Sequence, residues 1–197
     1  MNIFVSILTT VLLFWAARVD NRIRQIPRGA GLGILAIGLF VLLWNRLWVE
    51  ALYYVLAIWC TSGGMWSLVL IVASMAAVYI GSDSSIPLAI GIVLVSVFFW
   101  MRWFGGGDAQ IAIGLIGIGH DWPVLVLLVG CTIMWMVILV FRKHGFSDGL
   151  RRLRYVFLNL GAKPDVYAIR TPWAVIALIS GILYLWLWPV VTGGIQA

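Results

Sequence analysis

Charged residues are scarce in this chain, and their scarcity excludes most soluble folds. Only 10% of its 197 residues are Asp, Glu, Lys or Arg, whereas 63% are hydrophobic. A soluble domain carries roughly 25% charged residues, and no soluble fold of this size could hide so much apolar surface. Cysteine is also rare: Cys60 and Cys131 lie in different apolar stretches. We interpret both as small packing residues and not as a disulfide or a metal pair. The sequence contains no metal-ligand cluster, and no cofactor is expected.

The apolar residues form segments of helix length from one end of the chain to the other. Eight segments are predicted to be spans: 2–19, 29–46, 48–63, 65–82, 86–104, 108–119, 122–141 and 172–192. An α-helix of about 20 residues crosses about 30 Å of hydrocarbon. The first segment lacks a basic region and a cleavage site of small residues, so we expect it to be retained.

The sequence therefore predicts an all-α, polytopic transmembrane helix bundle of six to eight spans in one domain, residues 1–197. Segments 48–63 and 108–119 are short enough to be tilted, re-entrant or interfacial. A six-span core with an interfacial or re-entrant insertion within 48–82 is the second interpretation.

The net charge of +6 is explained by topology. Basic residues cluster in two loops, at 18–28 and 142–170, and short basic loops between spans are typical of the cytoplasmic face. Eight crossings place 12 of the 13 Lys and Arg residues on that face and only Arg46 outside. We therefore expect a lipid bilayer as the partner of this surface and no nucleic acid.

The second basic loop contains a helical pattern. Leu150, Leu153, Phe157 and Leu160 recur at helical spacing, with arginines mostly on the opposite side. This predicts an amphipathic helix near 147–160 on the inner leaflet.

Only seven acidic residues are available for chemistry. Five are predicted to lie in solvated turns or loops: Glu50, Asp83, Asp121, Asp148 and Asp165. In particular, His120 and Asp121 are interpreted as an external turn and not as a functional pair. The two others, Asp20 and Asp108, lie at the edge of predicted spans, where an ionised carboxylate is costly without a partner or water.

Three glycines precede the second of these aspartates. A run of glycines between two apolar helices allows another backbone to approach closely, so Gly105, Gly106 and Gly107 could open a cavity beside Asp108 for an extended peptide. With eight spans, Asp20 and Asp108 lie on the same side of the membrane. Two neighbouring carboxylates share a proton, so one can deprotonate water while the other protonates a scissile carbonyl. Alternatively, Asp20 pairs with Arg22 or Arg24, and Asp108 is the N-cap of the next helix.

Three segments resemble the type IV prepilin peptidase and archaeal preflagellin peptidase family, which are aspartic membrane proteases of the GxGD class. The first is Asp20 followed by an Arg-bearing stretch and the pair Ile26-Pro27. The second is the GxGD element, residues 105–108. The third is the terminal segment 171–181, which begins Thr-Pro-Trp-Ala. The three occur in order at the beginning, middle and end of the chain.

The resemblance implies a catalytic pair, Asp20 and Asp108, with Ile26, Pro27 and the three glycines shaping the site. It also implies a prepilin or pseudopilin substrate, cut at the cytoplasmic face of a bacterial inner membrane between its basic leader and its hydrophobic helix. The Cys-x-x-Cys loop of the larger bifunctional members is missing. The chain therefore resembles the short branch that acts as a peptidase without N-methyltransferase activity.

Two non-proteolytic functions are the alternatives. One is a small transporter or channel whose aspartates bind a cation or relay protons, although the chain has no second glycine run that would suggest an inverted repeat. The other is an inactive pilus-assembly scaffold. A rhomboid-like serine protease is disfavoured because both histidines, His120 and His144, lie in predicted turns or loops.

Overall fold

The computed structural model describes residues 3–23, 25–63, 67–81, 83, 85–100, 106–151 and 173–192. These residues form helices joined by short connections, with no strand among them. In chain order the helices are α1 (Ile3–Ile23), α2 (Arg28–Trp44), α3 (Trp48–Gly63), α4 (Ser67–Ile80), α5 (Ser85–Trp100), α6 (Gly106–Gly119), α7 (Trp122–His144), α9 (Trp173–Ile182), the π-helical turn η2 (Leu183–Leu187) and α10 (Trp188–Val191).

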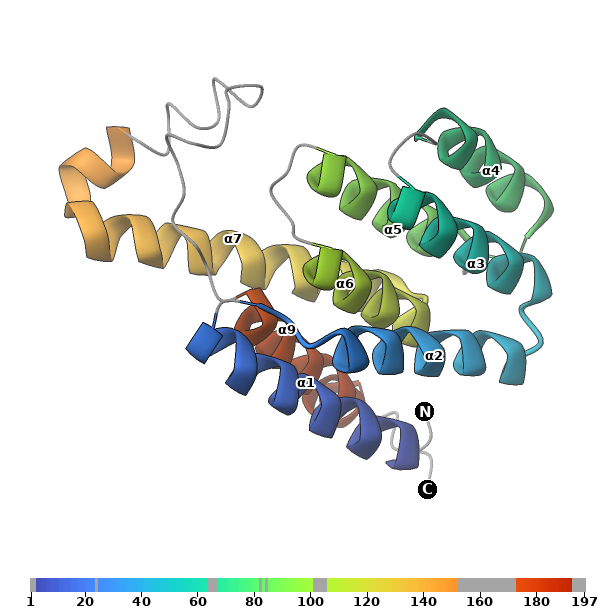
Figure 1. Ribbon diagram of the computed structural model, residues 1–197, viewed down its shortest axis with the longest axis horizontal. Helices are drawn as coiled ribbons and strands as arrows, with labels where there is room; N and C mark the ends of the chain where they lie inside the picture. The colour runs from blue at the N-terminus through green and yellow to red at the C-terminus, as the bar shows by residue number, and fades with distance from the viewer. Residues whose placement is uncertain are drawn as a thin grey trace.

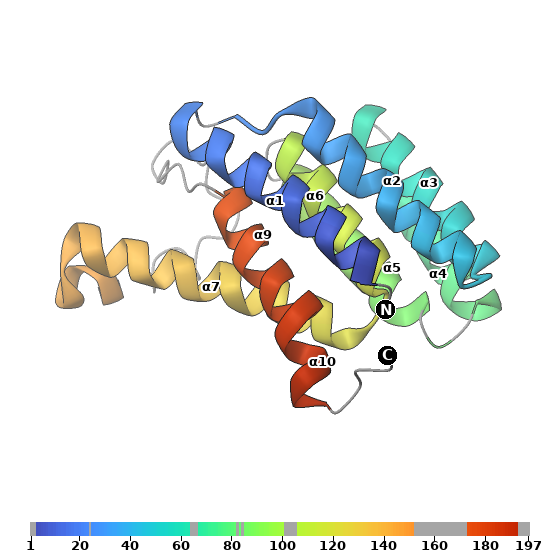
Figure 2. The ribbon, with the colours of Figure 1, turned by 90° about the horizontal axis from the view of Figure 1, so that it is seen from below.

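The helices run alternately up and down the bundle. Figures 1 and 2 show the end of α1 and the beginnings of α2, α6 and α9 directed toward the same end of the molecule. The C-terminal helices η2 and α10 continue directly from α9. Among the described elements, α1 packs most extensively on α9, and α2 packs most extensively on α6. The first and last parts of the chain are therefore neighbours.

Helix α6 occupies the centre of the bundle. It contacts α2, α3, α5, α7 and α9. From Ile111 to Gly119 every residue is buried, as expected for a helix that is apolar on all sides and lacks a polar face for solvent. The central position of α6 explains why a helix that carries a charge in its first turn is otherwise entirely uncharged.

Helices α2 and α6 cross at glycines. A Cβ on Gly114 would lie 3.0 Å from the carbonyl carbon of Ile34, and a Cβ on Gly38 would lie 2.9 Å from the carbonyl oxygen of Gly114. Small residues allow such close backbone approach in membrane helix pairs. Tyr54 of α3 lies over the crossing and donates a hydrogen bond to the carbonyl of Leu35, with an oxygen-to-oxygen distance of 3.2 Å. The crossing fixes α2 and α6 relative to each other.

The helix predictions agree with the structure in position, and the all-helical class is confirmed for the described residues. A helix occurs in each of the eight predicted ranges. Within the described part of the chain, three helices are by length and composition suited to cross a membrane: Ile3–Ile23, Trp122–Arg142 and Trp173–Val191. Shorter apolar helices occur at Arg28–Trp44, Trp48–Trp59 and Ser85–Phe99. Helix α1 continues about a turn beyond its predicted end and so includes Asp20.

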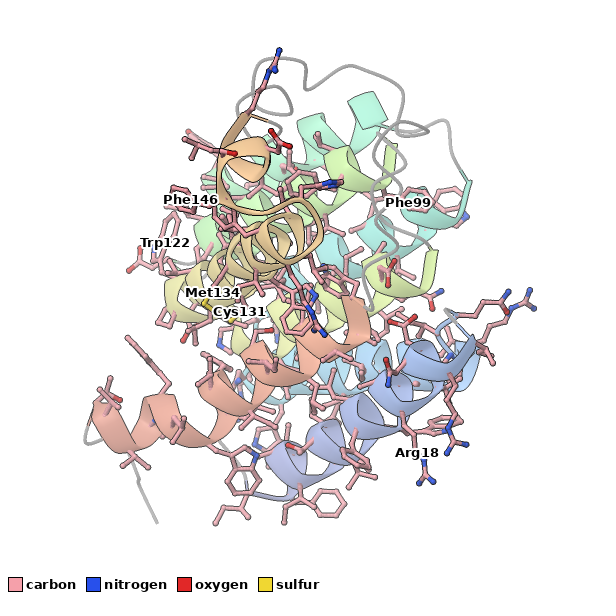
Figure 3. The ribbon with its side chains drawn as sticks, turned by 90° about the vertical axis from the view of Figure 1, so that its left-hand side faces the viewer. Arg18, Phe99, Trp122, Cys131, Met134 and Phe146 are labelled. Carbon is pink, nitrogen blue, oxygen red and sulfur yellow. The ribbon has the colours of Figure 1, made fainter. Side chains whose placement is uncertain are left out.

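The outer surface is apolar, as the composition indicates. Large hydrophobic side chains are exposed on several helices, among them Phe14, Phe40, Trp59 and Met134. Figure 3 shows Met134 and Cys131 on α7 and Phe146 beyond its end. Cys131 is a buried free thiol in the hydrophobic core, which agrees with its interpretation as a packing residue. An exposed surface of this kind suits a lipid environment.

The predicted amphipathic helix begins inside the described part of the chain. Residues 146–151 are helical, and Gly149 packs against Phe141 of α7. Phe146 and Leu150 are exposed. The remainder of the predicted range, 152–160, lies outside the described residues.

Membrane orientation can be tested by labelling single cysteines in a variant that lacks Cys60 and Cys131. Gln25 and Ser147 lie at the basic end of the bundle, Asn45 and Asp83 lie at the other end, and all four side chains are exposed. In intact cells, an impermeant thiol reagent is expected to label cysteines at Asn45 and Asp83 and to leave those at Gln25 and Ser147 unlabelled. External labelling at Gln25 would reverse the orientation.

Candidate active site

Asp20 lies on the buried face of α1. Leu13, Ala16 and Ala17 are buried at helical spacing, and Asp20 continues this pattern with only 5% of its surface exposed. The neighbouring arginine Arg22 is exposed on the opposite side of the helix. Asp20 therefore faces the interior, whereas Arg22 faces away from it. The other alternative partner of Asp20, Arg24, lies outside the described residues.

The carboxylate of Asp20 contacts the beginning of the last apolar helix. Its Oδ2 accepts a hydrogen bond from the backbone N–H of Ala174, at a nitrogen-to-oxygen distance of 3.2 Å. Ala174 is the second residue of α9. The first N–H groups of a helix have no partner within the helix, and the helix dipole is positive there. This contact therefore stabilises negative charge on Asp20.

Asp108 lies in the first turn of α6 and is partly buried. The helix begins at Gly106, two residues earlier, so the alternative interpretation of Asp108 as the N-cap is wrong. Its position still places a carboxylate at the positive end of the helix dipole. Gly105 of the same motif lies outside the described residues.

The linker after Asp20 packs directly on the glycine before Asp108. A Cβ on Gly107 would lie 2.7 Å from the Cβ of Ile26, closer than real side chains approach. Ile26 precedes Pro27, which has an extended conformation (φ −60°, ψ 129°) and forms the N-cap position of α2. Glycine is therefore required at position 107 for the linker to keep this position.

The other glycine of this motif within the described residues has a different environment. Among the residues that the structure describes, no neighbouring side chain or packed segment lies within 4 Å of the position that a Cβ on Gly106 would occupy, and Gly106 is exposed. One turn farther along α2, Gly31 leaves room for the side chain of Gln110. The contact between the two motifs therefore continues from the linker into the paired helices, while the surface at Gly106 stays open.

Together these contacts join the three segments on which the sequence hypothesis rests. Asp20 binds the first turn of α9, and Ile26 packs against Gly107. The last turn of α1 carries Asp20 and the first turn of α6 carries Asp108, and Figure 1 shows these two helix ends directed toward the same end of the bundle. Residues from all three segments thus form one candidate site: Asp20, Ile26, Pro27, Gly106, Gly107 and Asp108. Ala174 is a further member that sequence reasoning missed. Ala174 contributes only a backbone N–H, which no side-chain pattern reveals.

Glu50 was predicted to lie in a solvated turn, and that prediction is wrong. It lies in the first turn of α3, only 2% of its surface is exposed, and its Oε1 accepts a hydrogen bond of 2.6 Å from Ser85 Oγ. The helix begins at Trp48 and turns this face toward α5. Hydrogen bonding to Ser85 compensates part of the cost of burying a carboxylate. Asp83 and Asp148 are exposed as predicted, and Asp165 lies outside the described residues.

Asp121 forms a structural cap at the opposite end of the bundle. It accepts hydrogen bonds from the N–H of Val124 (3.3 Å) and from the hydroxyl of Tyr184 (2.9 Å). Burial raises the pKa of Asp121, and the bond from Tyr184 lowers it by a smaller amount. His120 and Asp121 lie in the connection between α6 and α7, as predicted, but the prediction that Asp121 is simply solvated is wrong, because it is half-buried and bonded to Tyr184. The sequence did not indicate the role of Tyr184 or that Asp121 is half-buried.

Comparison of the chain with protein-family models, with curated proteins and with solved structures gave no match. Within the described residues, no three His, Cys, Asp or Glu side chains come together in a group that could hold a metal ion. The candidate site is therefore defined by its own sequence motifs and by the contacts between them.

Proposed function

We propose that this protein is an intramembrane aspartic endopeptidase that removes the basic leader from type IV prepilin-like precursors. The observation that carries the proposal is the convergence of three separated motifs. Asp20 binds the backbone of Ala174, and Ile26 lies against Gly107, next to Asp108. Residues that resemble one family's site in three distant segments are thus neighbours in space. The reaction takes place at the cytoplasmic membrane face of a bacterial inner membrane.

The proposed mechanism uses the two carboxyl groups as one proton-sharing unit. Asp20 is the general base, because the N–H of Ala174 stabilises its ionised form. It removes a proton from water, whose oxygen attacks the scissile carbonyl carbon, while protonated Asp108 donates its proton to the carbonyl oxygen. Asp20 then transfers its proton to the amide nitrogen and the C–N bond breaks. The second hydroxyl of the intermediate returns a proton to Asp108 as the acid product forms.

The open surface at Gly106 supports access by an extended peptide. The missing side chain at this position leaves space next to the first turn of α6, whereas Gly107 is fully occupied by Ile26. One glycine therefore positions the linker and the other leaves room for substrate. This division of roles accounts for glycine at positions 106 and 107.

The alternative functions are a transporter or channel and an inactive pilus-assembly scaffold. The scaffold is favoured by one observation: the bond from Ala174 to Asp20 is also what a structural helix cap would form. A cap needs only a hydrogen-bond acceptor, whereas a peptidase needs an ionisable pair. Replacement of the carboxylates by amides therefore separates these functions.

The activity itself is tested by co-expressing the chain with candidate prepilins from neighbouring genes. We expect each true substrate to lose its leader, seen as a mobility shift and as a new N-terminus by mass spectrometry. An empty vector is the control for host peptidases. Stable precursors that remain intact beside well-expressed protein would contradict the proposal.

A further inference from the structure

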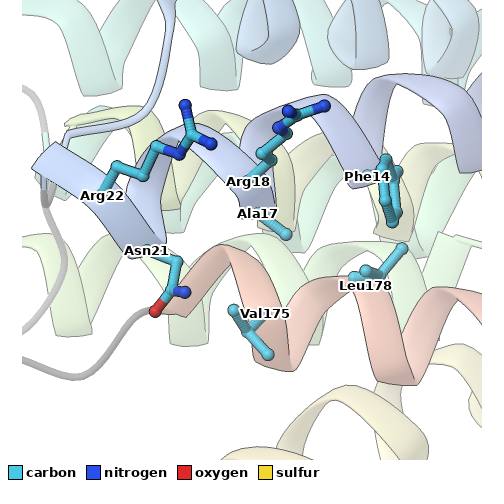
Figure 4. A pocket seen from close by; sticks show the side chains of 7 residues that line it. All are labelled: Phe14, Ala17, Arg18, Asn21, Arg22, Val175 and Leu178. Carbon is cyan, nitrogen blue, oxygen red and sulfur yellow. The ribbon is translucent and has the colours of Figure 1, made fainter.

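A second site lies on the outside of the bundle, in the groove between α1 and α9. It has a volume of about 420 Å³ and is lined by Phe14, Ala17, Arg18, Asn21, Arg22, Val175 and Leu178. Figure 4 shows Phe14 and Leu178 facing each other between the two helices, with Asn21 near the beginning of α9. Asp20 does not line this groove, because it points to the interior.

The groove is apolar along its length and basic at one end. Phe14, Val175 and Leu178 form the apolar part, whereas Arg18 and Arg22 stand one helical turn apart at the end of α1. In Figure 4 both arginine side chains extend from the same side of the helix. Both are exposed, and neither forms an ion pair with another described residue. The groove is therefore complementary in charge and polarity to an amphiphile with an anionic head group.

The position of the groove favours a lipid over a soluble anion as its ligand. Its apolar part faces outward from α1, where the surface includes the exposed side chains of Phe14 and Trp15. A free phosphate would gain no binding free energy from this apolar surface. An acyl chain would bury the surface and gain hydrophobic free energy. Basic pockets between membrane helices on the cytoplasmic side bind anionic lipid head groups, and guanidinium groups bind phosphate oxygens in a bidentate manner.

We propose that the groove between α1 and α9 binds an anionic phospholipid, with the phosphate at Arg18 and Arg22 and an acyl chain along Phe14, Val175 and Leu178. Asn21 donates its side-chain amide to the head group. The lipid therefore occupies the outer side of the same two helices that Asp20 joins on their inner side. This proposal does not depend on peptidase activity.

The test uses native mass spectrometry of the purified full-length protein, reconstituted with phosphatidylglycerol or with phosphatidylcholine. We expect wild-type protein to retain phosphatidylglycerol in preference. Arg18→Gln/Arg22→Gln should weaken this retention about tenfold, because it removes both guanidinium groups that contact the phosphate in the proposed site. The matched control is Arg142→Gln/Arg151→Gln, which removes the same charge from exposed positions toward the same end of the bundle and should change retention by less than twofold.

A second variant tests the apolar part of the groove. Leu178→Trp fills the space beside Phe14 and should lower retention of long-chain phosphatidylglycerol several-fold while Arg18 and Arg22 remain. Equal retention by the Arg18/Arg22 variant and wild type would overturn the proposal. So would unchanged retention by Leu178→Trp, or displacement of the lipid by millimolar inorganic phosphate, since either would indicate a site for the anion alone.

Discussion

Replacement of Asp20 or Asp108 by Asn is expected to reduce leader removal at least a hundredfold while the protein stays in the membrane. Asn has nearly the same shape as Asp and keeps an oxygen that can accept the bond from Ala174. It cannot exchange a proton with water or with the scissile carbonyl, and general acid–base catalysis contributes roughly 10²- to 10⁴-fold per group. The measurement is the initial cleavage rate of a co-reconstituted precursor at matched protein levels.

Two further variants make this experiment specific: one combines both Asn substitutions, and the other changes a third acidic residue. The proposed mechanism treats the two carboxyl groups as one unit, so Asp20→Asn/Asp108→Asn should be scarcely slower than either single variant. The matched control is Asp121→Asn, which changes another partly buried carboxylate at the opposite end of the bundle and should keep the rate within a few-fold of wild type.

Two outcomes would contradict the assignment. A single Asn variant at position 20 or 108 that retains more than a few per cent of the wild-type rate would show that its carboxyl group is structural. A loss in Asp121→Asn as large as that in Asp108→Asn would show that the site lies at the opposite end of the bundle from the one proposed.

The second large effect is expected from one methyl group at Gly107. In Gly107→Ala the new Cβ would lie 2.7 Å from the Cβ of Ile26, so the linker or the first turn of α6 must move. Overpacking of this kind costs about 1–3 kcal/mol, and a displacement of about 1 Å at a catalytic group can cost about a hundredfold in rate. We therefore expect a fall in cleavage rate of at least tenfold, with a lower midpoint of thermal unfolding.

Gly106→Ala is the matched control for this variant. The same methyl group, one residue earlier in the same motif, meets no packed neighbour within 4 Å in the described part of the chain and should leave the unfolding midpoint unchanged. Combining Gly107→Ala with Ile26→Gly removes the clash and should restore part of the rate. If Gly107→Ala were as active as Gly106→Ala, the contact between Ile26 and Gly107 would not matter to the site.

Much of the helical architecture could be predicted because each helix is an apolar run bounded by glycine or polar residues. The positions of α2, α3 and α7 follow directly from this pattern. The inward position of Asp20 was also present in the sequence, since Leu13, Ala16, Ala17 and Asp20 repeat at helical spacing. Asp20 was nevertheless predicted to lie at the edge of the first span, because that span was predicted to end before it.

The remaining features depend on which helices become neighbours, and local sequence does not contain that information. Glu50 was predicted to be solvated because nothing near it indicates that Ser85 will lie against it. The partners of Asp20 and Asp121 are likewise distant, at Ala174 and Tyr184. Buried polar groups need partners, but the sequence alone does not identify them.

The bond between Asp20 and Ala174 also sets an order of events during biosynthesis. These residues are 154 positions apart, and translation proceeds at about 5–20 residues per second. The first helix therefore reaches the membrane on the order of ten seconds before the N–H donor at the beginning of α9 has been made. A nascent chain cannot complete its candidate site during that interval, so the proposed cleavage would require α9 to have joined the bundle.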